Sequence, residues 1–291
     1  MDERDWLILK TLFEKKSITK TAEALFISQP ALSSRLQHIE SRFGTVIAVR
    51  GKKGVQFTPE GEYLVRASYE MLQKMRIFEE NIQNMHDQPT GILRIGASTF
   101  FTKYLLPELL RRFKVDYPGI EFKVTTGWSR EIVNLVYNND VHIGFVRGDY
   151  SFSGEKMLLF TEKMYVSSKE PLRFIDLPYR PRVDYRSEYS VQLLVDKWWN
   201  ENYSSPPQIG MEVDRVDTCK EMVIKGLGYA FLPEMILNNC KDICTHEMIY
   251  RSGKPLTRNT WMFYHKDTME LKLVQAFYEF IQSMNFNTLY F

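Results

Sequence analysis

Two short helices joined by a tight turn are predicted between Thr19 and Gly44, and this segment limits the fold of the chain more than any other. Thr19 can cap a first helix that runs to Phe26, and Ser28 can cap a second, because hydroxyl side chains accept hydrogen bonds from the unpaired N–H groups of a first helical turn. Pro30 then falls in the first turn of the second helix, where a missing N–H is tolerated. Gly44 ends the helical spacing of apolar residues. The pattern predicts a helix-turn-helix.

The second of these helices carries small and polar side chains that suit contact with DNA. Serine and glutamine can hydrogen-bond base edges or phosphates, and arginine and lysine supply positive charge. Residues 46–49 and 55–58 predict two short strands joined by a basic, glycine-flanked tip, which is a wing able to lie along a phosphate backbone. We expect the DNA contacts to come from Thr19, Lys20, Thr21, Ser28, Gln29, Pro30, Ser33, Ser34, Arg35, His38, Arg50, Lys52 and Lys53.

Positive charge is concentrated in this part of the chain. The 291 residues have a formal net charge of +2, whereas residues 15–58 hold eight basic and two acidic side chains. A basic module on a slightly acidic remainder is the electrostatic footprint of a DNA-binding domain. We therefore expect double-stranded DNA as a partner.

A long helical pattern from about residue 60 to 85 follows the wing. Its apolar positions step mainly by three or four residues, and they are Tyr63, Leu64, Ala67, Met71, Met75, Phe78, Ile82 and Met85. A helix of that length on a small domain needs a partner for its apolar stripe, and a second copy of the chain would supply one. Packing of the stripe against the chain's own body is the alternative.

A family resemblance is carried by the string from Thr19 to Ser33, by Ile39-Glu40 and Phe43-Gly44, and by Thr58-Pro59-Glu60-Gly61. These residues resemble the LysR-type transcriptional regulators, and the stretch from Ser28 to Ser33 is the most specific part. Ala48 departs from the pattern, since the family usually has a large apolar residue there. The resemblance implies a DNA-binding transcription regulator that acts as a homodimer or homotetramer on an inverted-repeat site, with RNA polymerase as a further partner.

Strands and helices alternate after a break at Pro89-Thr90-Gly91. Strands are predicted at 92–97, 120–124 and 141–146, with a helix from Ser98 to Arg112 and another after Ser129, which indicates an α/β subdomain with a largely parallel sheet. A second set has strands at 158–160, 164–166, 181–185, 211–213 and 229–233 and helices at 192–201 and 217–225. A last strand at 260–264 precedes a helix over 271–284.

This second half resembles the effector domain of the same regulators, which has two Rossmann-like lobes of the type 2 periplasmic-binding-protein kind. The fold class implied is an α/β effector domain preceded by an all-α winged helix-turn-helix domain and a long linker helix. We expect the DNA-binding domain at 1–58, the linker or dimerisation helix at 59–88 and the effector domain at 91–291. Lobe I would hold about 91–160 and 266–291, and lobe II about 161–265.

Candidate effector-binding residues stand at helix starts and strand ends, where free N–H groups and the helix dipole favour anions. The hydroxyl-bearing helix starts are Ser98, Thr99, Ser129 and Thr218. Arg147 ends a predicted strand and Arg258 precedes the last one. Two guanidinium groups suit a ligand with more than one carboxylate, since guanidinium and carboxylate pair in bidentate geometry.

Four further strings resemble one branch of the family: 126–129, 141–148, 216–222 and 258–261. That branch is the catabolite control protein C and its relatives, which respond to citrate and regulate genes of central carbon metabolism. The resemblance therefore implies a small carboxylate, with citrate first, as the effector and no other cofactor.

Other functions are less consistent with the sequence. The five histidines are scattered and no nucleophile motif is present, so we expect no enzyme activity and no catalytic residue. Cys240, Cys244 and His246 lack a fourth ligand at zinc spacing, so no metal site is expected. Cys219 beside Lys220, at a predicted helix start, leaves a thiol redox sensor in the same fold as the alternative. The charged amino terminus and the short apolar runs predict a cytoplasmic protein with no signal peptide and no membrane partner.

Overall fold

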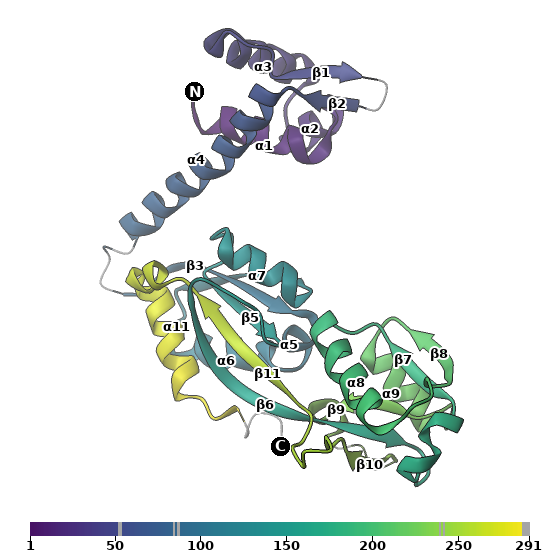
Figure 1. Ribbon diagram of the computed structural model, residues 1–291. Helices are drawn as coiled ribbons and strands as arrows, with labels where there is room; N and C mark the ends of the chain where they lie inside the picture. The colour runs from purple at the N-terminus through teal and green to yellow at the C-terminus, as the bar shows by residue number, and fades with distance from the viewer. Residues whose placement is uncertain (52–53, 84, 86–87, 239, 241, 287–291) are drawn as a thin grey trace. The chain divides into compact units, whose positions relative to one another are not determined.

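The protein divides into two compact units, Met1–His86 and Asp87–Phe291 (Figure 1). The computed structural model describes residues 1–51, 54–83, 85, 88–238, 240 and 242–286. Each unit has apolar cores of its own, with one buried cluster in the first and several in the second. The expected tips of the wing, Lys52 and Lys53, lie outside the described residues.

The first unit contains the predicted helix-turn-helix and wing. Its elements are α1 (Glu3–Lys15), α2 (Ile18–Ala24), α3 (Gln29–Phe43), β1 (Ala48–Gly51), β2 (Gly54–Phe57) and α4 (Pro59–Gln83). Ser17, not Thr19, caps α2, because its Oγ accepts from the backbone N–H of Lys20. Ser28 caps α3 as predicted, and Gly44 ends that helix at a φ of +63° in the left-handed region that glycine tolerates.

Helix α4 starts in close contact with the wing. A Cβ on Gly61 would lie 2.0 Å from the carbonyl oxygen of Ile47, so only glycine allows this approach. The first half of α4 packs on α1 and buries Leu64 and Val65. Beyond it, Phe78 is 66% exposed, and Met71 and Ile82 are also exposed within this unit. The stripe is therefore divided, since Leu64 near its beginning is buried, whereas Phe78 and Ile82 near its end are exposed.

The second unit is built on a mixed seven-stranded sheet in the order β10-β6-β11-β5-β3-β4, with β9 also paired to β6 (Figure 1). Its elements are β3 (Gly91–Ser98), α5 (Thr99–Tyr104), α6 (Leu106–Asp116), β4 (Ile120–Gly127), α7 (Ser129–Tyr137), β5 (Ile143–Arg147), β6 (Glu155–Ser168), η1 (Phe174–Tyr179), β7 (Arg182–Tyr185), α8 (Tyr189–Asn202), β8 (Ile209–Val213), α9 (Val216–Ile224), β9 (Ala230–Pro233), α10 (Glu234–Leu237), β10 (Cys244–Glu247), β11 (Thr257–Tyr264), η2 (Lys266–Glu270) and α11 (Lys272–Ser283).

The sheet is parallel only in part. Strand β3 pairs in parallel with both β4 and β5, as the strand–helix alternation predicted. Strands β11, β6, β9 and β10 all pair antiparallel, so the expectation of a largely parallel sheet is too broad. Strand β11 lies between β5 and β6 and runs opposite to both, a pairing between distant parts of the chain that local periodicity does not predict.

Two long strands connect the lobes of this unit. Two separate strands were expected within 158–166, but β6 is one strand of 14 residues that runs from lobe I into lobe II. Strand β11 returns beside it, pairing with β6 along its length and with β5 from Thr260 to Tyr264. Residues 260–264 therefore pack in lobe I, whereas the sequence placed them in lobe II.

Lobe I has helices on both faces of its sheet, and its first helix is broken. The single helix expected from Ser98 to Arg112 is two helices, because Pro107 in the first turn of α6 has no N–H to continue α5. Helices α6 and α11 meet through Phe113 and Phe277, while α7 packs beside β3 and β5. Lobe II contains the parallel pair β7–β8 and helices α8 and α9.

Candidate effector pocket and nucleic-acid interface

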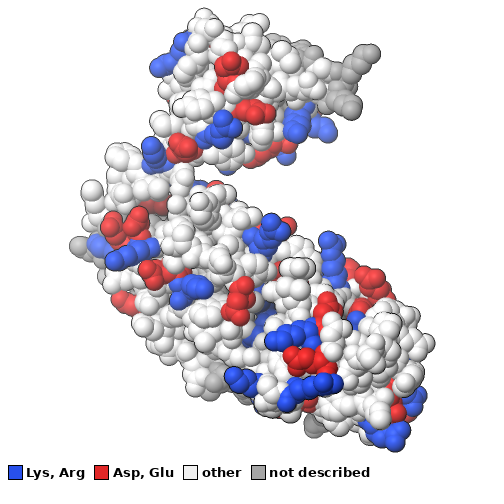
Figure 2. Space-filling model, in the orientation of Figure 1, with Lys and Arg blue, Asp and Glu red and all other residues white. Residues whose placement is uncertain are grey.

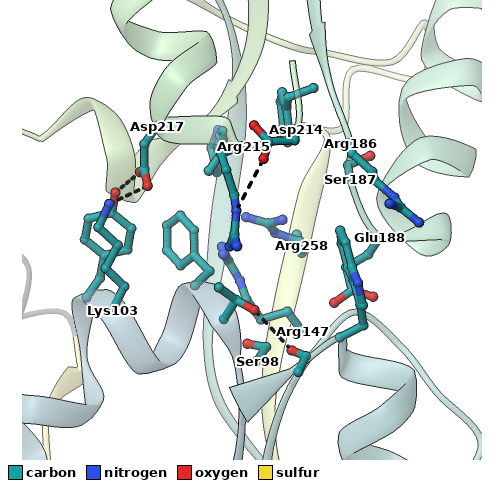
Figure 3. A pocket seen from close by; sticks show the side chains of 18 of the residues that line it. Ser98, Lys103, Arg147, Arg186, Ser187, Glu188, Asp214, Arg215, Asp217 and Arg258 are labelled. Carbon is teal, nitrogen blue, oxygen red and sulfur yellow. Dashed lines mark hydrogen bonds and ion pairs between the residues drawn. The ribbon is translucent and has the colours of Figure 1, made fainter. Parts of the chain in front are cut away.

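A cavity of about 450 Å³ lies between the two lobes of the second unit. This volume is within the range of about 300–1,000 Å³ that small-molecule pockets occupy. The side chains labelled in Figure 3 converge on it from both lobes. Its lining residues are Ser98, Thr99, Phe100, Lys103, Tyr104, Gly127, Trp128, Glu131, Arg147, Tyr185, Arg186, Ser187, Glu188, Asp214, Arg215, Val216, Asp217, Pro233 and Arg258. Four predicted effector residues are among them: Ser98, Thr99, Arg147 and Arg258.

Both predicted arginines share one buried carboxylate. Arg147 ends β5, Arg258 lies on β11, and Glu162 lies opposite Arg258 in the cross-strand register of β6. Arg258 donates to Glu162 Oε1 from Nε at 3.1 Å and from Nη2 at 2.9 Å, and Arg147 pairs with the same oxygen. All three residues are more than 90% buried. The group therefore has a formal charge of +1 rather than +2, which the sequence did not reveal.

Aromatic packing and burial tune this charged group. The guanidinium of Arg147 lies 3.6 Å from the ring centroid of Phe100, a cation–π distance. Burial lowers the pKa of Arg258 to about 10, because the low-dielectric interior disfavours the charged form. Ser98, at 2% exposure, has a hydroxyl with no hydrogen-bond partner among the described residues. An acceptor in the cavity would satisfy this hydroxyl and meet the positive charge beside it.

Ser129 lies at the start of α7 but does not line the cavity. Its Oγ accepts from the backbone N–H of Arg147 at 3.1 Å, and the side chain is fully buried. Its backbone N–H donates to Glu188 Oε1 of lobe II at 2.7 Å, and Glu131 accepts from the N–H of Trp128 at 2.8 Å. The start of α7 is therefore occupied by the protein's own carboxylates, and Ser129 has a structural role here.

Thr218 also falls outside the cavity lining, although Val216, the first residue of the same helix α9, lines the cavity. Its neighbour Asp217 lines the cavity and receives hydrogen bonds from Lys103 and Tyr104 across the lobes. Burial opposes ionisation of Asp217, but these two bonds outweigh it and lower the pKa of the carboxyl. Asp217 thus links lobe II to α5 of lobe I.

Two lining arginines were missed by the sequence analysis. Arg186 directly follows β7, and Arg215 lies two residues beyond the end of β8. Parallel strands end at the same edge of a sheet, and the backbone N–H of Arg186 bonds the carbonyl of Val213 there at 3.0 Å. The signal that could have found them is the position of each arginine just after a strand.

Helices α2 and α3, with the turn between them, expose seven of the thirteen predicted DNA contacts. Thr19, Lys20, Ser28, Gln29, Pro30, Ser34 and His38 are exposed, and Ser33 is half-buried. Gln29 accepts a hydrogen bond from the Thr19 hydroxyl at 3.4 Å, so the first turn of α2 is joined to the start of α3. The exposed side of the motif therefore holds polar groups that can face a duplex.

Two predicted DNA contacts have partners inside the unit. Thr21 is fully buried, and its hydroxyl donates to the Ser17 carbonyl at 2.7 Å, so it does not face solvent. Arg35 forms ion pairs with Asp2 and with the buried Asp5 of α1. These contacts hold α3 against α1, a role that the sequence did not predict.

The wing is a hairpin in which β1 pairs antiparallel with β2. The backbone of Arg50 lies in β1, while Lys52 and Lys53 lie outside the described residues.

On the face shown in Figure 2, basic and acidic side chains are interspersed over the second unit. Positive charge is not segregated on that face.

Metal and thiol sites find no support in the described part of the chain. No group of three or more metal-ligating side chains occurs among the described residues. Cys244 begins β10, a strand that the sequence analysis missed. Burial raises the pKa of the Cys219 thiol to about 12, so the reactive thiolate is disfavoured. No described helix is long and apolar enough to cross a bilayer.

Comparison with known families gives the origin of both units. Residues 4–62 match the model of the bacterial regulatory helix-turn-helix proteins of the lysR family, and residues 86–285 match the LysR substrate binding domain. The chain belongs to the LysR family of transcription regulators. These families consist of regulators and not of enzymes, in agreement with the sequence analysis.

Two relatives from Bacillus subtilis (strain 168) match over nearly their full length. The uncharacterized HTH-type transcriptional regulator YraN is 41% identical over 282 residues, covering 97% of this chain and 98% of its own. The uncharacterized HTH-type transcriptional regulator YkuM is 33% identical over 279 residues, covering 95% of each chain. Neither description specifies an effector.

Solved structures share the fold at lower identity. Full-length OxyR from Pseudomonas aeruginosa has a TM-score of 0.68 at 18% identity, covering 98% of this chain and 96% of its own. Full-length CbnR in complex with its target DNA has a TM-score of 0.66 at 17% identity, covering 97% and 99%. The likeness confirms the predicted architecture of a helix-turn-helix domain followed by a two-lobed effector domain.

Proposed function

We propose that this LysR-type regulator senses a small carboxylate in the cavity between its lobes, with citrate as the first candidate, and that it controls genes of central carbon metabolism. The observation that carries the ligand class is the pair of buried guanidinium groups beside the unpartnered hydroxyl of Ser98. A carboxylate supplies acceptor oxygens for the guanidinium groups and for the hydroxyl. No other cofactor is proposed.

The electrostatics of the cavity base favour an anion. Glu162 neutralises one of the two guanidinium charges and leaves a net charge of +1 on Arg147 and Arg258. In a partly desolvated site such a charge attracts a carboxylate more strongly than it would in water. Lys103 is already paired with Asp217, so the base of the cavity offers the first place for a carboxylate to bind.

We further propose that the first unit binds an inverted-repeat DNA site as a dimer or tetramer. The exposed polar side of α3 supports DNA reading, and CbnR, which shares the fold, has been solved on its target DNA. The second half of α4 supports self-association, because its apolar side chains Met71, Ile77, Phe78 and Ile82 are exposed. Contact with RNA polymerase remains part of this proposal.

Calorimetric titration of the full-length protein with citrate tests the effector assignment. Arg147→Ala is expected to weaken binding roughly tenfold or more, which corresponds to about 1.4 kcal/mol or more. Arg147→Lys should restore binding only in part, because lysine keeps the charge but loses the planar fork of donors. Arg251→Gln, at an exposed turn outside the cavity, is the matched control.

The ligand proposal fails if the wild-type protein shows neither heat nor thermal stabilisation with millimolar citrate or with other small carboxylates. It also fails if Arg147→Ala binds as tightly as the wild type. A different anion would be identified by the same titration with phosphate and sulfate. Membership of the family does not depend on this result.

A further inference from the structure

Two arginines of lobe II, Arg186 and Arg215, line the cavity on the side opposite Ser98; Arg215 extends toward Arg258 and Arg147, whereas Arg186 points to one side (Figure 3). Arg186 and Arg215 follow the neighbouring ends of β7 and β8, whose backbones are joined at that edge. The guanidinium of Arg186 lies 5.6 Å from the ring centroid of Trp128, which belongs to lobe I. The charge of Arg215 therefore approaches the cavity base from the other lobe, and that of Arg186 lies at the side of the cavity near Trp128.

The other ionised groups of the cavity are already engaged in close contacts. Lys103 pairs with Asp217, Glu131 and Glu188 accept the N–H groups at the start of α7, and Arg147 and Arg258 share Glu162.

Arg215 has only a distant partner, Asp214 at 3.9 Å, and both side chains are largely exposed, so this pair contributes little. Arg186 has no carboxylate within ion-pair distance, 4.0 Å, among the described residues. Among the described cations of the lining, these two are thus the ones without a close carboxylate.

We propose that Arg186 and Arg215 form a second carboxylate subsite and make the effector a di- or tricarboxylate. This inference rests on the proposed function, since it adds a subsite to the same cavity. One carboxylate binds at Ser98, Arg147 and Arg258, and the remaining carboxylates bind at the two arginines of lobe II. A ligand that contacts both subsites joins the lobes through its own carbon chain.

A monocarboxylate cannot make the same set of contacts. At the cavity base it would accept the hydrogen bond of Ser98 and pair with the net positive charge of Arg147 and Arg258. It would not supply a carboxylate to Arg186 and Arg215. A ligand with carboxylates at both ends gains charge-assisted hydrogen bonds at the second subsite as well. The number of carboxylates, rather than ligand size alone, is therefore the property that lobe II selects.

The test is a titration of the full-length protein with three probes of rising charge: butyrate, succinate and citrate. Arg186→Gln and Arg215→Gln are compared with the wild type and with Arg251→Gln, an exposed lobe II arginine outside the cavity. Each cavity variant is expected to weaken citrate and succinate binding about tenfold, as for loss of one charge-assisted hydrogen bond, and to leave butyrate within about twofold. Arg186→Lys and Arg215→Lys should retain part of the preference.

The measured quantity is the ratio of the citrate and butyrate dissociation constants, which a general loss of structure would not change selectively. The inference is overturned if wild-type protein binds butyrate as tightly as citrate, or if the ratio is the same in the two glutamine variants and in the control. In either case carboxylate binding, and with it the proposed function, would stand. If the wild type binds none of the three probes, the proposed function fails and the second subsite fails with it.

Discussion

The buried group formed by Arg147, Glu162 and Arg258 predicts unequal effects when its members are removed. In the wild-type protein both guanidinium groups donate to Oε1 of Glu162. Replacing Glu162 by glutamine leaves these two buried cations without a carboxylate. Breaking a buried ion pair from one side costs about 3–5 kcal/mol, because the remaining charge is desolvated and unpaired. We expect Glu162→Gln to lower the free energy of unfolding of the effector unit by that amount or more.

Replacing Arg147 by methionine should be milder. It leaves Arg258 with both of its bonds to Glu162, at 3.1 and 2.9 Å, so the remaining pair is neutral. The loss is one charge-assisted hydrogen bond and the contact with Phe100, and it is offset by removal of the excess buried charge. Because of that offset, we expect a cost of about 1–2 kcal/mol, near the lower end of the roughly 1.5–3 kcal/mol of a single hydrogen bond to a charged group.

Urea unfolding of the full-length protein, followed by tryptophan fluorescence, measures this difference. Four of the five tryptophans lie in the effector unit, so its transition dominates the signal. The dependence of the free energy on urea should be similar in all variants if the unfolded states are alike. Glu121→Gln, on the exposed edge strand β4, is the control and should stay within about 0.5 kcal/mol of the wild type. The reasoning is refuted if Arg147→Met is as destabilising as Glu162→Gln.

Three further outcomes are expected. Arg35→Ala should weaken operator binding and also destabilise the first unit by about 1–3 kcal/mol, because it removes the charged partner of the buried Asp5 carboxylate. Ser34→Ala should affect DNA binding alone, and equal thermal unfolding of the two variants would contradict this reasoning. Charged residues at Met71 and Phe78 together should give monomers or aggregates in sedimentation analysis, since an apolar seam does not accept unpaired charge, and a soluble dimer carrying both changes would show that the stripe packs elsewhere. Burial raises the pKa of Cys219 to about 12, so iodoacetamide at pH 8 should label this thiol far more slowly in the native protein than in urea, and equal rates measured by mass spectrometry would argue against that burial.

The sequence alone predicted the features that depend on residues close together in the chain. The cap at Ser28, the proline in the first turn of α3 and the glycine at the end of that helix are all confirmed, because capping is set within a few residues. The parallel strands β3, β4 and β5 followed from the same kind of local periodicity. The division into a DNA-binding unit and an α/β unit needed no more than these patterns.

Only the tertiary structure decided which charged groups meet. Arg258 and Glu162 are 96 residues apart and pair because β11 and β6 lie in a particular antiparallel register, which no local pattern encodes. The same is true of Glu188, whose carboxylate occupies the start of α7 where the sequence suggested a ligand site. Caps and periodicity are properties of contiguous residues, whereas the partner of a buried charge is fixed by how distant strands align. The family resemblance could therefore imply two lobes, and the sequence could propose ligand residues at strand ends and helix starts, but the charge inside the cavity was determined by the packing of those lobes.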